Sequence, residues 1–372
     1  MSDQLKTSKT SPPDGATLQY GGQAVIEGVM MRGPRYFAVA CRKPDGDIVV
    51  EREEVDKSIV GKFKWLNRPF LRGTLALIDA MALGTRALAF ASNVQLQAQQ
   101  AKQNAMGTEA ASPTPLKRLE EEALSSAASI VNGVPVVVPE QKSTTQKIND
   151  IAIGGTLIFS LCFAVALFIA LPTLLTGLLF RHAGLARQIA SHRSSSLNVS
   201  DGLIRMAIFF GYISLISMMK NIREVFMYHG AEHKAINTLE AGLPLTIENA
   251  LKASRIHPRC GTSFIFIVLV INLIVFTVLP RPDFILTRML LHIAVTPIVA
   301  GIAYEVIKFA GKFRRNPLVM AVLAPGMWSQ YLTTREPNAG QIEVALAALT
   351  SVLVAEGHLP AAKPSDIEPV TA

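Results

Sequence analysis

The feature that most constrains this chain is an apolar stretch over residues 151–180 that contains no charged residue. At about 1.5 Å per residue, a helix of that length exceeds a hydrocarbon core of about 30 Å. Because lipid cannot satisfy unpaired backbone groups, such segments cross a membrane as helices. Three further apolar segments have a suitable length, and they are Leu203–Met219, Phe264–Leu279 and Met289–Ala310. The sequence therefore predicts a mainly α, polytopic helical membrane protein with about four transmembrane helices.

The composition agrees with a membrane location. Hydrophobic residues make up 50% of the chain and charged residues only 17%, whereas charged residues reach about 25% in soluble domains. The formal net charge is +8, and basic residues beside spanning helices contact anionic lipid head groups. No aromatic and basic pattern of an RNA-binding sheet is present. We expect the lipid bilayer as a partner, and no nucleic acid.

Basic residues in the loops predict the orientation. The loop between the second and third apolar segments is the most basic, and basic loops stay in the cytoplasm. This predicts a multi-pass protein of the cell (inner) membrane with both termini cytoplasmic, and it places residues 220–263 in the cytosol. The basic residues of that loop are Lys220, Arg223, Lys234, Lys252, Arg255 and Arg259.

The N-terminal part, residues 19–95, is predicted to be a small β-rich unit with an amphipathic helix. Tyr36–Cys41 and Asp47–Val55 alternate like strands around the turn residues 43–46. Glycines within residues 21–33 fit tight strand turns better than a phosphate loop, because they lack the P-loop ending. Residues 71–93 carry charges that are costly in a membrane, so we expect a helix on the membrane surface or against the bundle. Whether it spans stays open.

The remaining divisions follow from composition. Residues 1–18 and 359–372 read as disordered tails, and residues 96–145 as a flexible linker. Residues 146–315 form the predicted transmembrane bundle, in which Arg205 reaches the membrane surface from near a helix end and Glu305 needs a partner. Residues 316–358 are predicted as an interfacial segment with a turn at Pro325–Trp328, followed by an amphipathic helix over Gln341–Ala355.

Candidate metal ligands gather in the cytoplasmic loop. His229 and His233 lie at i and i+4, so their imidazoles share one face of a helix. Ile222, Phe226 and Ile236 fall on the same stripe, which predicts that the histidines point inward. A buried neutral imidazole needs partners for both ring nitrogens, and a metal ion is one such partner.

A second short helix is predicted to complete a helical hairpin. Gly242 and Pro244 end the first helix, and Thr246 can cap the next one. Folding back near residue 243 brings His257 level with the two histidines, with Cys260 within reach. A zinc-like divalent ion would find three imidazoles and a thiolate there, or three of these ligands and a water molecule. The open alternative is a polar network in which these histidines bond to glutamates or backbone and Cys260 is an inert buried thiol.

Four separated motifs resemble those of the DUF1385 family, and they are GGQAVIEGVMMRGP, YHGAEHKAINTLEAG, HPRCGTSF and PGMWSQYLTTREP. The family comprises bacterial membrane proteins described as predicted metal-dependent enzymes, and the resemblance covers roughly residues 19–95 and 145–356. It implies a membrane location and a metal site on His229, Glu232, His233, His257 and Cys260. It supplies no reaction.

Two functions remain open. In the first, a metal-dependent hydrolase acts on a membrane-associated substrate, with Glu232 as general base. Arg259 then steadies an anionic group, and Glu27 or Arg32, marked by the first motif, completes the cleft. In the second, the protein is a non-enzymatic scaffold or assembly factor whose metal or His/Glu network only holds the hairpin together, and whose β-rich unit recruits a protein partner.

Overall fold

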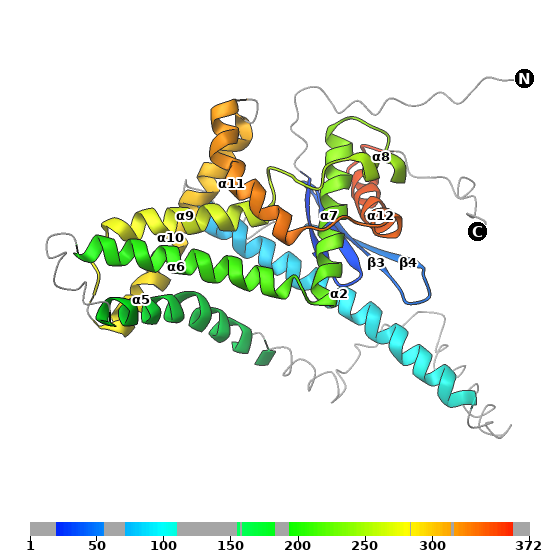
Figure 1. Ribbon diagram of the computed structural model, residues 1–372. Coiled ribbons are helices and arrows are strands. Elements are labelled where there is room, and N and C mark those ends of the chain that lie inside the picture. The colour runs from blue at the N-terminus through cyan, green and yellow to red at the C-terminus, as the bar shows by residue number, and fades with distance from the viewer. Residues whose placement is uncertain are drawn as a thin grey trace, which may run out of the picture. The chain divides into compact units, whose positions relative to one another are not determined.

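The computed structural model describes residues 20–55, 71–109, 155–156, 158–182, 193–282, 284–313 and 316–359 (Figure 1). It is mainly helical, with long apolar helices and one N-terminal sheet, which confirms the predicted fold class. The predicted tails at residues 1–18 and 359–372, apart from Leu359, and most of the predicted linker lie outside the described residues. The chain divides into two compact units, residues 1–94 with 168–372 and residues 95–167.

The sheet is an antiparallel meander of four strands in the order β1-β2-β3-β4. The strands are β1 (Gly21–Val25), β2 (Gly28–Arg32), β3 (Tyr36–Arg42) and β4 (Ile48–Glu54). The predicted pair of strands around residues 43–46 is confirmed as β3 and β4, and Gly46 takes the positive φ of 100° that the turn requires. The earlier hairpin is tighter, and its tip places Glu27 at a φ of 50°, which is uncommon for a residue with a side chain.

Helices cover both faces of the sheet. Helix α2 (Leu71–Glu109) packs Leu83, Ala87 and Ala91 against one face. Helices α7 (Lys220–Glu240) and α12 (Ala339–Ala355) pack against the other face. Helix α12 covers the predicted helix at Gln341–Ala355, buries residues along most of its length and packs into the core. Two-sided burial explains why β2 and β3 read as nearly continuous apolar runs.

The start of α2 contacts the bundle rather than the sheet. Arg72 donates two hydrogen bonds of 2.6 Å to Glu305 on α10 (Ile285–Lys312). Thr74 donates to the carbonyl of Pro297, and a Cβ on Gly73 would lie 2.6 Å from the side chain of Tyr304. Glu305 thus has the partner that its apolar helix demands.

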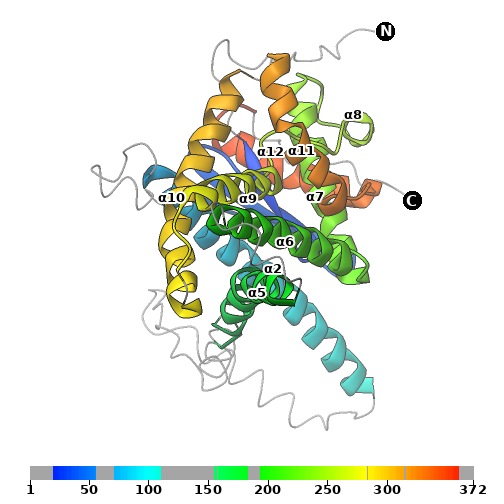
Figure 2. The same ribbon diagram turned by 60° about the vertical axis from the view of Figure 1, so that its left-hand side comes forward.

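Five helical segments are long and apolar enough to cross a membrane, namely Arg72–Gln100, Ile158–Leu179, Ser195–Ile216, Gly261–Val278 and Ile285–Phe309. Within the larger unit, α6 (Arg193–Ile216) lies beside α9 (Gly261–Val278) and α5 (Leu171–His182), and α9 also contacts α10 (Figure 2). A π-helical turn, η2 (Ala166–Ala170), precedes α5 and its Pro172. In the smaller unit, Phe159 and Phe163 stack with ring centroids 6.5 Å apart.

Two details of the bundle differ from the sequence prediction. Arg205 was expected to reach the membrane surface from near a helix end, but α6 begins at Arg193, so Arg205 lies in mid-helix and is only 6% exposed. The predicted turn at Pro325–Trp328 is absent, because α11 (Pro317–Thr333) continues through Pro325.

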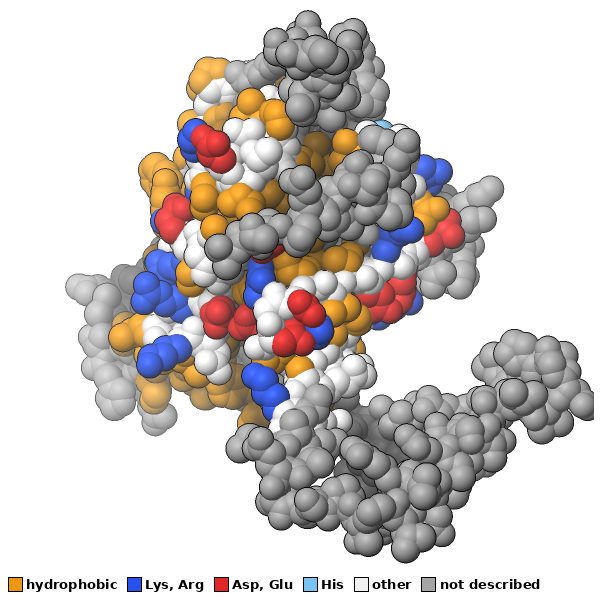
Figure 3. Space-filling model, turned by 90° about the vertical axis from the view of Figure 1, so that its right-hand side faces the viewer, with side chains coloured by type: hydrophobic (Ala, Val, Ile, Leu, Met, Phe, Trp, Pro, Cys, Tyr) orange, Lys and Arg blue, Asp and Glu red, His pale blue; other side chains and the backbone are white. Residues whose placement is uncertain are grey.

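The face of the molecule in Figure 3 mixes acidic and basic side chains, as surfaces in water do.

Candidate metal centre

Helix α7 supplies two of the candidate ligands. It ends at Glu240, and Gly242 adopts a φ of 66°, the left-handed conformation that terminates helices. Thr246 caps α8 (Ile247–Lys252) by accepting from the Asn249 N–H, which confirms the predicted cap. Helix α8 stops at Lys252, short of His257, so an irregular segment carries the chain from α8 to Cys260.

His229, His233 and Cys260 form a compact group, which we call the His–Cys cluster. Their potential ligand atoms all lie within 4.8 Å of one another. The Nε2 atom of His229 lies 3.3 Å from Sγ of Cys260, and the centroids of the two imidazole rings are 4.5 Å apart. Cys260 is the N-cap of α9, where its Sγ accepts from the Thr262 N–H. The cluster therefore joins α7, which packs against the sheet, to the start of the apolar helix α9.

Backbone carbonyls orient both imidazoles. Nδ1 of His229 lies 2.9 Å from the carbonyl oxygen of Thr333, and Nδ1 of His233 lies 2.6 Å from that of Arg255. A carbonyl oxygen only accepts, so both Nδ1 atoms carry the proton. Each Nε2 atom therefore has a lone pair available, as in metal-binding histidines fixed by an outer hydrogen bond.

This donor set fits zinc. Imidazole nitrogen and thiolate sulfur are the usual zinc ligands. Tetrahedral zinc with ordinary bond lengths separates a nitrogen and a sulfur ligand by about 3.5 Å, close to the 3.3 Å between His229 and Cys260. Three protein ligands leave one position open, which is the arrangement found in catalytic rather than structural zinc sites.

His257 lies beside the cluster but has other partners. Its ring centroid is 5.8 Å from that of His233. Its Nδ1 accepts from the Arg259 N–H, so the proton is on Nε2, which lies 3.6 Å from Glu240. Burial lowers the pKa of His257, an effect that Glu240 opposes. Neither ring nitrogen offers a free lone pair, so the structure leaves His257 outside the ligand group.

Glu232 is buried on α7 between the two cluster histidines in sequence. Burial raises its pKa to about 7, whereas His229 and a hydrogen bond from the Gly22 N–H act in the opposite direction. A Cβ on Gly22 would lie 3.0 Å from the Glu232 side chain, so β1 passes directly over it. The sheet thus contributes to the surroundings of the cluster.

The three predicted substrate-binding residues are dispersed. Arg259 pairs closely with Glu240. Glu27 accepts from the hydroxyl of Tyr228 at 3.2 Å, and burial with the neighbouring Glu224 raises its pKa. Arg32 is half-buried at the end of β2. None of the three belongs to the His–Cys cluster.

Supporting residues downstream were not identified from the sequence. Gln330 is fully buried on α11, accepts from the His257 N–H and donates to the His257 carbonyl and to Ser263. The sequence feature that could have identified Gln330 is its occurrence within an otherwise apolar helix. The chain after α11 crosses α7 at Gly230, where a Cβ would lie 2.1 Å from the Arg335 carbonyl oxygen. Gly230 therefore permits the approach that brings Thr333 to His229.

Together these features define a membrane protein with a His–Cys cluster that could hold a metal ion. The chain belongs to the family described as "Protein of unknown function (DUF1385)", which matches residues 68–355 and confirms the resemblance. It is 34% identical over 339 residues to "Uncharacterized protein YqhQ" of Bacillus subtilis (strain 168), covering 90% of this chain and 92% of that protein. No solved structure matches the chain.

Proposed function

We propose that this protein is a metal-dependent hydrolase of the cell inner membrane that acts on a membrane-associated substrate from the cytoplasmic side. The observation that carries the proposal is the His–Cys cluster, with three ligand atoms within 4.8 Å of one another and an available lone pair on each Nε2 atom. A divalent ion held there, zinc by its donor set, would supply Lewis-acid activation of water. His257 remains a candidate ligand only if its loop rearranges.

The protein side chains supply the proton chemistry. Glu232 is the candidate general base, because it lies within electrostatic range of His229 and follows it by one turn of α7. The Gly22 N–H holds the Glu232 carboxylate in place. Arg259 is the candidate anion-binding residue, and it would exchange Glu240 for a substrate group. Glu27 and Arg32 lie outside the cluster, and we assign them no role in the reaction.

The side chains of α11 favour the hypothesis that the substrate is associated with the membrane. Gln330 and Thr333 lie buried on the side that supports the cluster. Trp328 and Tyr331, on the same turns, are 66% and 52% exposed. Such exposed aromatic residues are typical of the membrane interface, which favours a position of α11 beside the lipid. Lipids or lipid-linked molecules are the substrates best placed to reach the cluster.

The proposal is tested with zinc-loaded protein reconstituted into vesicles of total bacterial lipid extract. Mass spectrometry of the lipids is expected to show hydrolysis products with the wild type. Glu232→Gln should retain its zinc and lose the products, and His229→Ala should lose both. Equal products from zinc-containing Glu232→Gln and the wild type would contradict the assigned role of Glu232. Equal products from His229→Ala would contradict the whole proposal.

A second candidate is a scaffold or assembly factor with a structural metal. The specific observation in its favour is the burial of His233 and Cys260 at the junction of α7 and α9. An ion bound there would link α7, which packs against the sheet, to α9 of the bundle. In that case Glu232→Gln leaves fold, metal content and cellular function unchanged, whereas His233→Ala impairs all three.

A further inference from the structure

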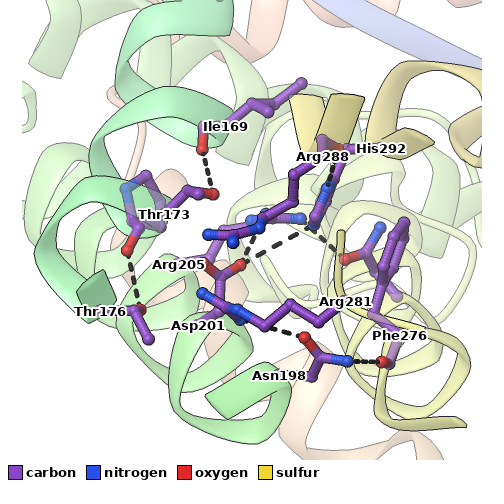
Figure 4. A network of polar contacts seen from close by, with 12 residues as sticks. Ile169, Thr173, Thr176, Asn198, Asp201, Arg205, Phe276, Arg281, Arg288 and His292 are labelled. Atoms are coloured by element: carbon purple, nitrogen blue, oxygen red, sulfur yellow. Dashed lines mark hydrogen bonds and ion pairs between the residues drawn. The ribbon is translucent and has the colours of Figure 1, made fainter. Parts of the chain in front are cut away.

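A second polar centre lies inside the bundle, where Asp201, Arg205 and His292 lie close together (Figure 4). Together with Asn272, which bonds to Arg205, they form what we call the bundle ion network. Arg205 donates to Asp201 at 3.0 Å, and to Asn272 on α9 at 2.8 Å. The side chains of this ion pair are only 7% and 5% exposed. The two charges compensate each other, as buried charges must.

His292 lies next to this pair. Its Nδ1 donates to the Arg288 carbonyl at 2.8 Å, and its ring stacks on Phe276 at 4.0 Å with an interplanar angle of 7°. Its Nε2 lies 3.8 Å from Asp201. These contacts join α6, α9 and α10 at one end of the bundle.

Two more arginines lie at this end, and their partners are neutral. Arg281 donates to the side-chain oxygen of Asn198 at 3.0 Å, and Arg288 donates to the Pro282 carbonyl at 3.1 and 2.8 Å. Arg281 lies within electrostatic range of both Arg288 and Asp201. Among the described residues, this group holds three guanidinium groups and one carboxylate. Nε of Arg205 is also buried without a partner.

The position of Arg281 and Arg288 at the ends of two candidate spans favours a phosphate group as their ligand. Arg281 follows the end of the candidate span Gly261–Val278, and Arg288 lies in the first turn of α10. Spanning helices end where hydrocarbon gives way to lipid head groups. The planar guanidinium group binds phosphate through paired hydrogen bonds, which a lysine cannot reproduce. Repulsion between Arg281 and Arg288 would be relieved by an anion between them.

We propose that this end of the bundle binds a phosphate group through Arg281 and Arg288, with Arg205 contributing a third positive charge from inside the bundle. The phosphate belongs either to a phospholipid head group or to a free phosphate ion. Asn198, which bonds to Arg281 and to the carbonyls of Phe276 and Leu279, positions this arginine. The site lies at the opposite end of α9 from Cys260 and does not depend on the metal.

The test measures the thermal unfolding midpoint of the full-length protein in dodecyl maltoside micelles. One arm adds sodium phosphate against sodium chloride of equal ionic strength. The other adds phosphatidylglycerol against a phosphate-free galactolipid. A bound phosphate is expected to raise the midpoint by about 3 °C or more. Arg281→Gln and Arg288→Gln should abolish the rise, and Arg52→Gln, on the exposed side of β4, should keep it.

Each outcome is decisive. A rise with both probes means that the site accepts free and lipid phosphate, and a rise with phosphatidylglycerol alone assigns a head group. No rise with either probe, or an equal rise in wild type and both glutamine variants, overturns the proposal. Should the glutamine variants fail to fold, Arg281→Lys and Arg288→Lys retain the charge and should show a reduced rise.

Discussion

The His–Cys cluster and the bundle ion network are built alike and end with different chemical capacities. Each starts from an i, i+4 pair on one helix, His229 and His233 on α7 or Asp201 and Arg205 on α6. Each is completed by α9, which contributes Cys260 at its start and Asn272 further along. In the network Asp201 and Arg205 pair with each other, whereas in the cluster the Nε2 atoms of both histidines lie close to Cys260 Sγ as candidate ligands of one ion. The difference teaches that burial of polar groups does not by itself make a ligand site. The ligand atoms of the cluster already converge, whereas the network has a candidate ligand site only where Arg281 and Arg288 add further positive charge.

The largest expected effect comes from breaking the network. Asp201→Ala leaves the Arg205 guanidinium buried with Asn272 as its one remaining side-chain partner among the described residues. Removing one partner of a buried ion pair costs about 3–5 kcal/mol. The free energy of unfolding, measured by SDS titration in mixed micelles, should fall by that amount while metal content is unchanged. The double variant Asp201→Asn/Arg205→Gln should recover part of the loss. A single variant as stable as wild type would show that the ion pair does not stabilise the bundle.

Metal removal should affect the cluster alone. At a free zinc concentration of about 100 Kd, bound zinc stabilises the folded state by about 2.7 kcal/mol. Adding EDTA should remove this stabilisation from the wild type and have no effect on Cys260→Ala, which lacks the thiolate. Asp201→Ala should respond to EDTA as the wild type does. If chelation leaves wild-type stability unchanged, the cluster holds no ion that matters for folding.

Gly230 tests the outer contacts of the cluster. In Gly230→Ala the new Cβ meets the Arg335 carbonyl oxygen, and the chain that holds Thr333 against His229 must move. Overpacking of this kind costs about 1–3 kcal/mol, and zinc affinity should fall with it. Gly211→Ala on α6 is the matched control, because its Cβ meets open space. Equal zinc affinity in both alanine variants would show that the Thr333 contact does not position His229.

The smallest effect is expected at Thr246. Thr246→Ala removes the cap of α8 and should cost about 1 kcal/mol. Hydrogen exchange should accelerate within residues 247–252 and nowhere in α9. Because the ligand group contains no residue of α8, zinc content should stay at the wild-type value. Loss of zinc from this variant would mean that the segment carrying His257 belongs to the ligand set after all.

Local sequence rules predicted the framework of the cluster. Helical periodicity places His229 and His233 on one face, and the cap at Thr246 and the glycine at 242 follow from backbone chemistry. The orientation of His257 could not be predicted, because it depends on the Arg259 N–H and on Glu240, which meet only in the folded loop. The contacts of the Thr333 and Arg255 carbonyls with the two histidines could not be predicted either, because every residue has a backbone carbonyl.

The bundle ion network was missed for a different reason. Apolar periodicity fixed the existence of the helices but not their ends, and α6 starts ten residues earlier than the predicted Leu203. That shift moves Arg205 from a helix end to its middle, beside Asp201. The partners Asn272 and His292 come from helices far along the chain, and their register against α6 depends on side-chain packing.

The most direct test of this account is the metal content of the purified protein, measured by elemental analysis without chelators. We predict about one zinc ion per wild-type chain, a strong loss in His229→Ala, His233→Ala and Cys260→Ala, and retention in Asp201→Asn. Wild-type protein that folds without a stoichiometric metal ion would contradict the account, and the cluster would then be a polar contact between α7 and α9.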